Sequence, residues 1–207
     1  MTRIKVLIFD ELPSQASVGI SNDYILKHIS KIKNDAYRAS SSIAYSLLGS
    51  MLQEVFGISI NDVTFTENVH GKPIICDTDI YFNISHSANA VMCAVSDHEV
   101  GVDIEKICDI RDAIVKRCFS ASEKDQVSSA EDFYRIWTLK EAYLKAIGTG
   151  IDRKLDSLSL DLGDTVTCTD NGVAVPYHFC SVISNGFAVS VCSEDNISSE
   201  NIMITIK

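Results

Sequence analysis

Trp137-Thr138-Leu139-Lys140-Glu141-Ala142-Tyr143-Leu144-Lys145 places three charged side chains among apolar neighbours. Apolar residues recur at helical spacing through this stretch and glycines follow it, which predicts a helix over Glu131–Ile147. On that helix Glu141 and Lys145 lie one turn apart on the same side. Such a pair is either an ordinary helical ion pair, worth about 0.2–0.5 kcal/mol, or part of a site.

Gly101-Val102-Asp103-Ile104-Glu105 alternates apolar residues with glycine and acids. A period of two predicts a strand, here Glu99–Glu105, with both carboxylates on one face. One interpretation is the solvated face of an edge strand. The other joins these acids to Glu141 in an all-oxygen site for a hard divalent cation, for which magnesium fits best because it keeps positions open for water and phosphate oxygens. Neighbouring lysines supply positive charge for such phosphates.

Phe82-Asn83-Ile84-Ser85-His86-Ser87 places two hydroxyls and an imidazole at the end of a predicted strand. These groups donate hydrogen bonds to anions, although a lone histidine is more often a structural residue. A hairpin of Ala90–Ser96 with Glu99–Glu105 is expected to bring His86 and the acids onto neighbouring strands.

Four short motifs follow one another over residues 71–150: Gly71–Pro73 (Gly-Lys-Pro), Phe82–Ser87, Gly101–Glu105 and Trp137–Lys145. In this order and spacing they resemble the signature series of 4′-phosphopantetheinyl transferases. The resemblance is to the monomeric two-lobed type that activates nonribosomal peptide, polyketide and siderophore synthetases. Asp35-Ala36-Tyr37-Arg38 further resembles the stretch that opens a long helix in that family.

The resemblance implies an enzyme that moves phosphopantetheine from coenzyme A to a serine of an apo acyl or peptidyl carrier protein. Magnesium, or manganese in its place, assists the transfer, and adenosine 3′,5′-bisphosphate is released. The metal ligands implied are Asp103, Glu105 and Glu141. Glu141 is also the implied base, directly or through a water, with Lys145 as the second catalytic residue.

The resemblance also implies which residues bind coenzyme A. Lys72 and Pro73 would line the adenine and ribose end. The residues expected to contact phosphates are Arg38, Ser85, His86, Lys140 and Lys145. Exposed lysines at Lys27, Lys31 and Lys33 either add a contact to the 3′-phosphate or form a solvated helix face.

The implied fold is α+β, a pseudo-dimer of two similar α/β lobes, residues 1–99 and 100–207, with the active site at the lobe interface. The patterns agree with such lobes: a long helix is predicted at Asp35–Val55, and Ala90–Ser96 and Phe187–Ser193 are similar apolar strands, each following a turn. Asn185-Gly186 predicts a tight hairpin before the second of these strands.

Composition limits the remaining possibilities. The 207 residues are 46% hydrophobic and 22% charged, as in a globular chain, and no apolar run is long enough to cross a membrane. Seven cysteines without a Cys-x-x-Cys pair predict buried, reduced thiols in the cytoplasm. Expected partners are coenzyme A and an apo carrier protein, with no nucleic acid and no membrane, and the expected state is a monomer. The net charge of −10 argues against a polyanionic ligand unless positive charge is local.

Two other functions fit the same residues. One is a different magnesium-dependent phosphotransferase or hydrolase, although the chain lacks a P-loop and an Asp-x-Asp motif. The other is a non-catalytic protein that binds coenzyme A or carrier domains. Ile107–Val127 is expected either to expose an apolar patch for the carrier protein, flanked by Lys116 and Arg117, or to complete the core.

Overall fold

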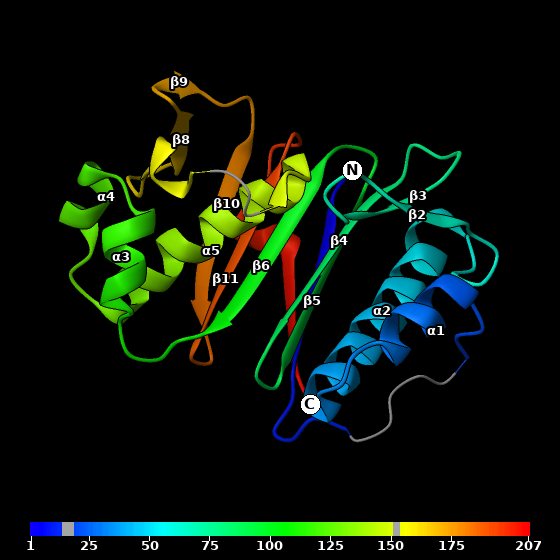
Figure 1. Cartoon of the computed structure of the whole chain (residues 1–207). Helices are drawn as coiled ribbons and strands as arrows, with labels where there is room; N and C mark the ends of the chain where they lie inside the picture. The colour runs from blue at the N-terminus through cyan, green and yellow to red at the C-terminus, as the bar shows by residue number, and fades with distance from the viewer. Residues whose placement is uncertain (14–18, 151–153) are drawn as a thin grey trace.

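Two sheets pack face to face between two long helices in the computed structural model, which describes residues 1–13, 19–150 and 154–207 (Figure 1). The helices are α1 (Asp23–Ser30), α2 (Asp35–Phe56), α3 (Asp112–Cys118), α4 (Ala121–Gln126) and α5 (Ala130–Ile147). The strands are β1 (Arg3–Ile8), β2 (Phe65–Glu67), β3 (Pro73–Ile75), β4 (Tyr81–Ser87), β5 (Ala90–Ser96), β6 (Val100–Lys106), β7 (Leu158–Asp161), β8 (Thr167–Asp170), β9 (Val173–Ala174), β10 (His178–Ser184), β11 (Phe187–Ser193) and β12 (Ile202–Ile206).

The first lobe is a sheet of order β12-β1-β5-β4, whose outer face is covered by α2 (Figure 1). Helix α2 begins where the Asn34 side chain accepts a hydrogen bond from the Tyr37 amide, and it ends at Gly57, whose φ of 70° suits glycine. Its buried residues, such as Leu48 and Leu52, pack against the outward side chains of β5. The first lobe therefore has a hydrophobic core of its own.

The second lobe is a sheet of order β10-β11-β6 covered by α5, with α3 and α4 beyond that helix (Figure 1). Ser129 caps the start of α5 and Gly148 its end. Helix and strand approach closely, since a Cβ atom on Gly101 would lie 2.0 Å from the Ala142 carbonyl oxygen. Glycine at position 101 is what lets α5 lie flat on β6.

The two lobes repeat one connection. β1, α2, β4 and β5 are arranged like β6, α5, β10 and β11, and in both sheets the last strand lies between the other two. The similar strands Ala90–Ser96 and Phe187–Ser193 are β5 and β11, which occupy equivalent central positions. The expected two-lobed α+β fold is thereby confirmed.

A third core fills the space between the sheets. β6 contributes Val100, Val102 and Ile104 to it, so the alternate residues Gly101, Asp103 and Glu105 point to the α5 side. The alternation in the sequence thus places both acids on one face of β6, as predicted.

Two expectations about connectivity are wrong. β5 and β6 do not form a hairpin: β5 pairs with β1 and β4, whereas β6 pairs with β11. Both strands carry apolar residues on their inner faces, so they pack across the lobe interface instead of sharing a sheet. The last strand of the predicted second lobe, β12, also belongs to the sheet of the first lobe, because it pairs in parallel with β1. The alternation of Ile202, Ile204 and Ile206 was the signal for this missed strand.

Two further observations bear on the expectations from composition. In the described ranges, no helix is both long and apolar enough to cross a membrane. All seven cysteines are free, but they differ in environment: Cys93, Cys168 and Cys192 are buried, whereas Cys108 is exposed. Buried thiols are therefore confirmed only for part of the set.

Candidate active site

The edge strands β4 and β6 lie side by side where the two lobes meet (Figure 1). Side chains of β4 bind backbone groups of β6: Asn83 Oδ1 accepts from the Val102 amide at 2.8 Å, and Ser87 Oγ accepts from the Lys106 amide at 3.2 Å. These contacts join the sheets by polar side chains instead of a backbone ladder. They also align Ser85 and Ser87 with the two acids of β6.

Asp103 lies at the centre of this junction with 4% of its surface exposed. Its Oδ1 accepts hydrogen bonds from Lys145 Nζ at 2.6 Å and from Ser85 Oγ at 2.8 Å. Lys145 Nζ also donates to Ser85 Oγ at 3.0 Å. The other carboxylate oxygen, Oδ2, is buried and has no hydrogen-bond partner among the described residues. This oxygen is therefore available to accept a hydrogen bond or to bind a cation.

The other two acids flank Asp103. Ser87 Oγ donates to Glu105 Oε2 at 2.6 Å, and burial raises the pKa of Glu105. Burial, followed by the charge of Asp103, raises the pKa of Glu141 to about 7. Glu141 Oε1 is a second buried oxygen with no partner in the described part of the chain. Strand β6 and helix α5 therefore bring the three predicted acids to one junction.

His86 also lies at this junction, on the side of α2. The edge of its ring faces Tyr37, with 4.8 Å between ring centroids. Burial, followed by the positive charge of Lys145, lowers the pKa of His86. Arg38 is held at the start of α2, where it donates to the Ile32 carbonyl at 3.0 Å and pairs with Asp35. With 43% of its side chain exposed, Arg38 lies at the rim.

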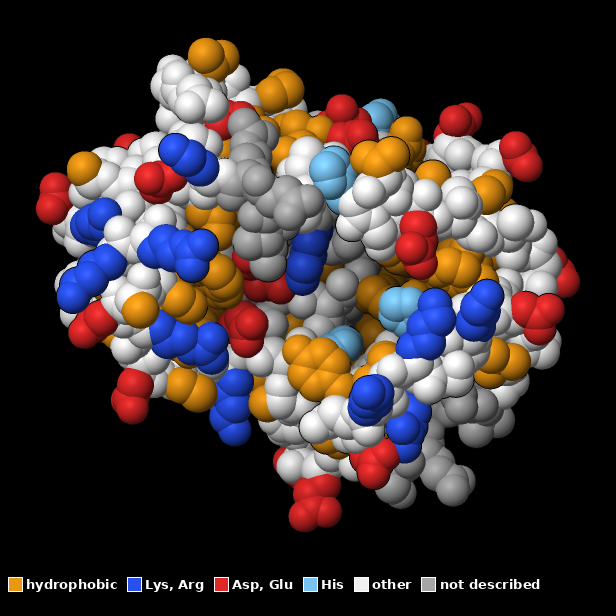
Figure 2. Space-filling model, in the orientation of Figure 1, with side chains coloured by type: hydrophobic (Ala, Val, Ile, Leu, Met, Phe, Trp, Pro, Cys, Tyr) orange, Lys and Arg blue, Asp and Glu red, His pale blue; other side chains and the backbone are white. Residues whose placement is uncertain are grey.

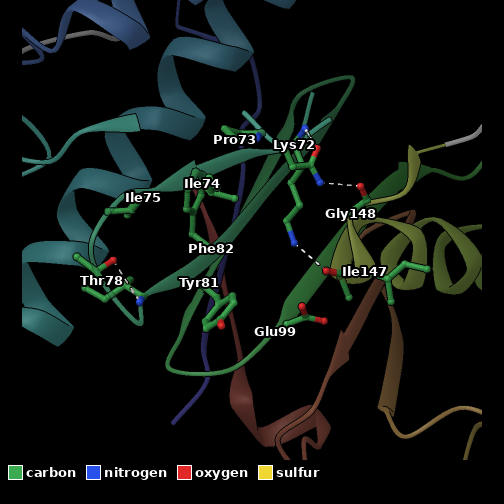
Figure 3. A pocket seen from close by; sticks show the side chains of 13 residues that line it. Lys72, Pro73, Ile74, Ile75, Thr78, Tyr81, Phe82, Glu99, Ile147 and Gly148 are labelled. Atoms are coloured by element: carbon green, nitrogen blue, oxygen red, sulfur yellow. Dashed lines mark hydrogen bonds between the residues drawn. The ribbon is translucent and has the colours of Figure 1, made fainter. Parts of the chain in front are cut away.

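Lys72 and Pro73 separate two cavities between the lobes. The cavity of about 210 Å³ extends from these residues to Glu141 and Lys145. Figure 3 shows the other, of about 260 Å³, with Lys72 pointing across it towards α5. Lys72 Nζ donates to the Ala146 carbonyl at 2.8 Å, and burial lowers the pKa of Lys72 to about 8. The Ala146 carbonyl therefore supplies a hydrogen-bond acceptor for a partly buried amine beside both cavities.

Lys140 lies away from the site, which corrects the expectation that it contacts phosphates. Its side chain forms an ion pair with Glu123 at 2.7 Å, and both side chains are fully buried. Its Nζ also donates to the carbonyl oxygens of Cys118, Leu155 and Leu158. The cause is helical phase, since Lys140 is about 100° from Glu141 and therefore points into the second lobe.

Two residues of the site, Asn83 and Tyr37, were not predicted as such, whereas the hydroxyl of Ser87 was expected to bind an anion. Asn83 shares the period of two that places Ser85 on the inner face of β4, so the pattern carried that signal. Tyr37 stands inside a quoted motif, but its contact with His86 joins elements that are far apart in the sequence. No local pattern predicts such a contact.

The face that contains this junction is hollowed between the lobes, and acidic, basic and histidine side chains line the hollow (Figure 2). The positive charge needed near an anion is therefore local in an acidic protein. Another group of potential metal ligands, Asp97, His98 and Asp195, lies elsewhere, with atoms within 4.8 Å of one another. Two of these residues are exposed, and both carboxylates pair with the N-terminal amine.

Comparisons with known proteins agree with the geometry. Residues 99–192 match the model of the 4′-phosphopantetheinyl transferase superfamily. The 4′-phosphopantetheinyl transferase gsp of Aneurinibacillus migulanus is 36% identical over 175 residues, which cover 78% of this chain and 73% of that protein. The 4′-phosphopantetheinyl transferase Sfp of Bacillus subtilis (strain 168) is 36% identical over 137 residues, 63% of this chain and 60% of that protein. The crystal structure of the holo-[acyl-carrier-protein] synthase of Thermotoga maritima aligns with 48% of this chain and 64% of that chain. The two are 20% identical, with a TM-score of 0.40.

Proposed function

Because this chain belongs to the 4′-phosphopantetheinyl transferase superfamily and is an enzyme that transfers phosphopantetheine to carrier proteins, we propose that Asp103, Glu105 and Glu141 hold the divalent cation of this reaction. The observation that carries the proposal is a pair of buried oxygens, Asp103 Oδ2 and Glu141 Oε1, that have no hydrogen-bond partner within the described ranges. Carboxylate oxygens suit magnesium, which keeps part of its water shell. A bound magnesium ion supplies positive charge to the pyrophosphate of coenzyme A, and manganese can replace it.

The three acids fit a cation in different ways. Asp103 is already held in place, because Lys145 and Ser85 fix its Oδ1 and leave Oδ2 free. Ser87 fixes one oxygen of Glu105 in the same way. Burial and then the charge of Asp103 raise the pKa of Glu141, and Lys145 opposes this shift only in part.

The surrounding side chains are suited to bind coenzyme A. Lys145 Nζ, with a side chain 30% exposed, lies beside Asp103 and can also donate to a phosphate. His86 and Arg38 lie on the α2 side of the junction and are proposed to bind further phosphate oxygens. Lys72 and Pro73, which line the cavity of about 210 Å³, are proposed to receive the nucleoside end.

Glu141 is the proposed base for the serine of the carrier protein. One carboxylate oxygen of Glu141 would hold the cation, and the other would accept the proton, directly or through one water. Removal of the proton lets the serine oxygen attack the phosphorus atom, and adenosine 3′,5′-bisphosphate departs. We expect the monomer to be active, since β4 and β6 of one chain supply both halves of the site.

The experiment is a transfer assay with coenzyme A, magnesium and an apo carrier protein, read as the intact mass of the carrier. The wild type should add one phosphopantetheine. Asp103→Asn keeps the size of the side chain but removes its charge, so it should lower the rate by at least about 100-fold. Asp97→Asn, in the exposed cluster, is the matched control and should leave the rate unchanged. An Asp103→Asn variant with near wild-type rate and unchanged magnesium dependence would remove Asp103 from the site.

A further inference from the structure

Asn68 lies at the start of the turn that joins β2 to β3 and leads to Lys72 and Pro73. Its Oδ1 accepts hydrogen bonds from the amides of His70 and Lys72, each at 2.9 Å. Its own amide donates to the Lys72 carbonyl at 2.9 Å. Gly71, with a φ of 82°, takes the left-handed conformation that suits glycine in a tight turn. The Asn68 side chain therefore fixes the shape of this turn from within.

The same turn is fastened to the second lobe by two side chains. Asn68 Nδ2 donates to the Gly148 carbonyl at 2.8 Å. Lys72 Nζ donates to the Ala146 carbonyl, also at 2.8 Å (Figure 3). Both carbonyls lie at the C-terminal end of α5, where the last carbonyl oxygens of a helix have no partner within it. The turn of the first lobe thus caps the helix that carries Glu141.

The close approach of the turn to α5 depends on glycine at position 148. A Cβ atom there would lie 2.7 Å from Asn68 Nδ2 and 3.1 Å from Lys72 Cδ. The φ of Gly148 is 66°, so this residue both ends the helix and leaves room for the turn. A side chain at position 148 would push the turn away from α5.

The hairpin of β2 and β3 needs such support at its tip. The two strands form a separate sheet with three residues in each strand, and a hairpin of this size is marginally stable alone. At its base, Phe65 and Ile75 pair with each other and are buried in the core of the first lobe. Near its tip, Tyr24 Oη donates to Glu67 Oε1 at 2.9 Å on the side of α1. The hydrogen bonds of Asn68 and Lys72 hold the tip on the side of α5.

The turn and α5 are both walls of the cavity of about 210 Å³ that is proposed for the nucleoside end of coenzyme A. The turn contributes Lys72 and Pro73 to it, and α5 contributes Leu144 and Lys145. Asn68 lines the other cavity, of about 260 Å³, and not this one. Its effect on a ligand would therefore pass through the wall of the cavity and not through direct contact.

We propose that Asn68 is a positioning residue for coenzyme A, whose side chain holds the turn against α5 and so sets the width of the cavity that receives the nucleoside end. The inference rests on the proposed function, because it takes this cavity as part of the coenzyme A site. Helix α5 itself is held on β6, where Gly101 lies against Ala142. Loss of the Asn68 contact should therefore move the turn and leave Glu141 and its neighbours in place.

The test is Asn68→Asp in the full chain. The carboxylate keeps an oxygen for the amides within the turn, but it puts a second acceptor where Nδ2 donated to the Gly148 carbonyl. Calorimetric titration with adenosine 3′,5′-bisphosphate should show a dissociation constant about fivefold higher than that of the wild type, because the net contribution of one hydrogen bond is of that order. The KM for coenzyme A should rise by a similar factor. Both kcat and the KM for the carrier should stay within about twofold, as expected when uniform binding of one substrate is lost.

Asn68→Ala adds no charge and should raise the dissociation constant at least as much. Asn61→Asp is the matched control, because Asn61 joins two segments of the first lobe in the same way. Its Oδ1 accepts from the Ser21 amide at 2.8 Å, and its Nδ2 donates to the Gly19 carbonyl at 2.9 Å. Asn61→Asp should leave the dissociation constant unchanged. Equal weakening by Asn61→Asp and Asn68→Asp would overturn the inference, as would wild-type affinity in Asn68→Ala.

The results also distinguish this inference from the proposed function. If Asp103→Asn loses transfer while Asn68→Asp keeps wild-type affinity for the bisphosphate, the inference fails and the proposed function stands. A fall in kcat of Asn68→Asp without a change in affinity would likewise overturn the inference. If the wild type neither binds the bisphosphate nor transfers phosphopantetheine, both fail.

Discussion

Glu141 shows how burial and a neighbouring charge prepare a single side chain for its role. In the folded protein its pKa is raised from 4.5 to about 7, first by burial and then by Asp103. Between these two values the folded chain binds a proton that the unfolded chain has released. The contribution to stability is therefore fully present below pH 4.5 and is lost as the pH rises through about 7. The affinity of Glu141 for a cation should instead increase as the pH rises, because the cation binds the ionised carboxylate.

We predict that the free energy of unfolding of the metal-free wild type, relative to Glu141→Gln, falls as the pH rises from about 5 to about 8. The slope cannot exceed about 1.4 kcal/mol per pH unit for one proton. Urea unfolding of both proteins across this range measures it. Manganese affinity of the wild type should rise over the same range. A pH-independent difference between the two proteins would show that Glu141 ionises normally in the fold.

Helix α5 contacts the site with one face and the core of the second lobe with another. One face presents Glu141 and Lys145 to β6, whereas Lys140 on another face holds α4 and the chain before β7. Glu123, the partner of Lys140, also accepts from the amides of Ser120 and Leu160. The pKa of Lys140 is lowered by burial, and Glu123 opposes that shift. The ion pair is thus part of the packing that sets the position of α5.

We predict that Lys140→Met destabilises the protein by about 3–5 kcal/mol, because it leaves Glu123 buried without its counter-charge. The double variant Lys140→Met with Glu123→Gln should recover part of this loss. Urea unfolding measures both effects. The KM for coenzyme A of the folded variant should match that of the wild type. A raised KM with unchanged stability would instead restore Lys140 as a phosphate contact.

The segment around α3, where a carrier protein was expected to dock, packs on the second lobe. Phe119 is fully buried, and Ile110, Ile114, Val115 and Cys118 pack partly buried against the core of the second lobe. Their partial burial favours the alternative that these residues complete the core over an exposed apolar patch between residues 107 and 127. Lys116 and Arg117 remain exposed at the end of α3.

We predict that charge reversal of Lys116 and Arg117 to glutamate raises the KM for an acidic carrier protein several-fold and leaves the KM for coenzyme A unchanged. The effect should weaken at high salt, because exposed charges are screened. Reversal of Arg3 and Lys207, which are exposed on the first lobe, is the control and should change neither constant. Equal effects on both substrates would contradict docking at α3.

The sequence alone determined what local periodicity can carry. The alternation in Gly101–Glu105 fixed which face of β6 holds the acids, and the helical spacing around Trp137 fixed the turn that presents Glu141 and Lys145. Ordered motifs with these residues also indicated the family, which the comparisons confirmed. These results follow from the period of a strand or helix, which depends on neighbours in the chain.

Only the tertiary structure decided which elements meet. The alternation of residues did not reveal that β6 pairs with β11 and not with β5, or that β12 pairs with β1. Strand pairing depends on which apolar faces bury each other. Lys140 is next to Glu141 in the sequence but points about 100° away from it around the helix, towards its partner Glu123 of α4. Likewise, Asp103 Oδ2 and Glu141 Oε1 are buried, without a partner among the described residues, only because strands and a helix from distant parts of the chain meet around them.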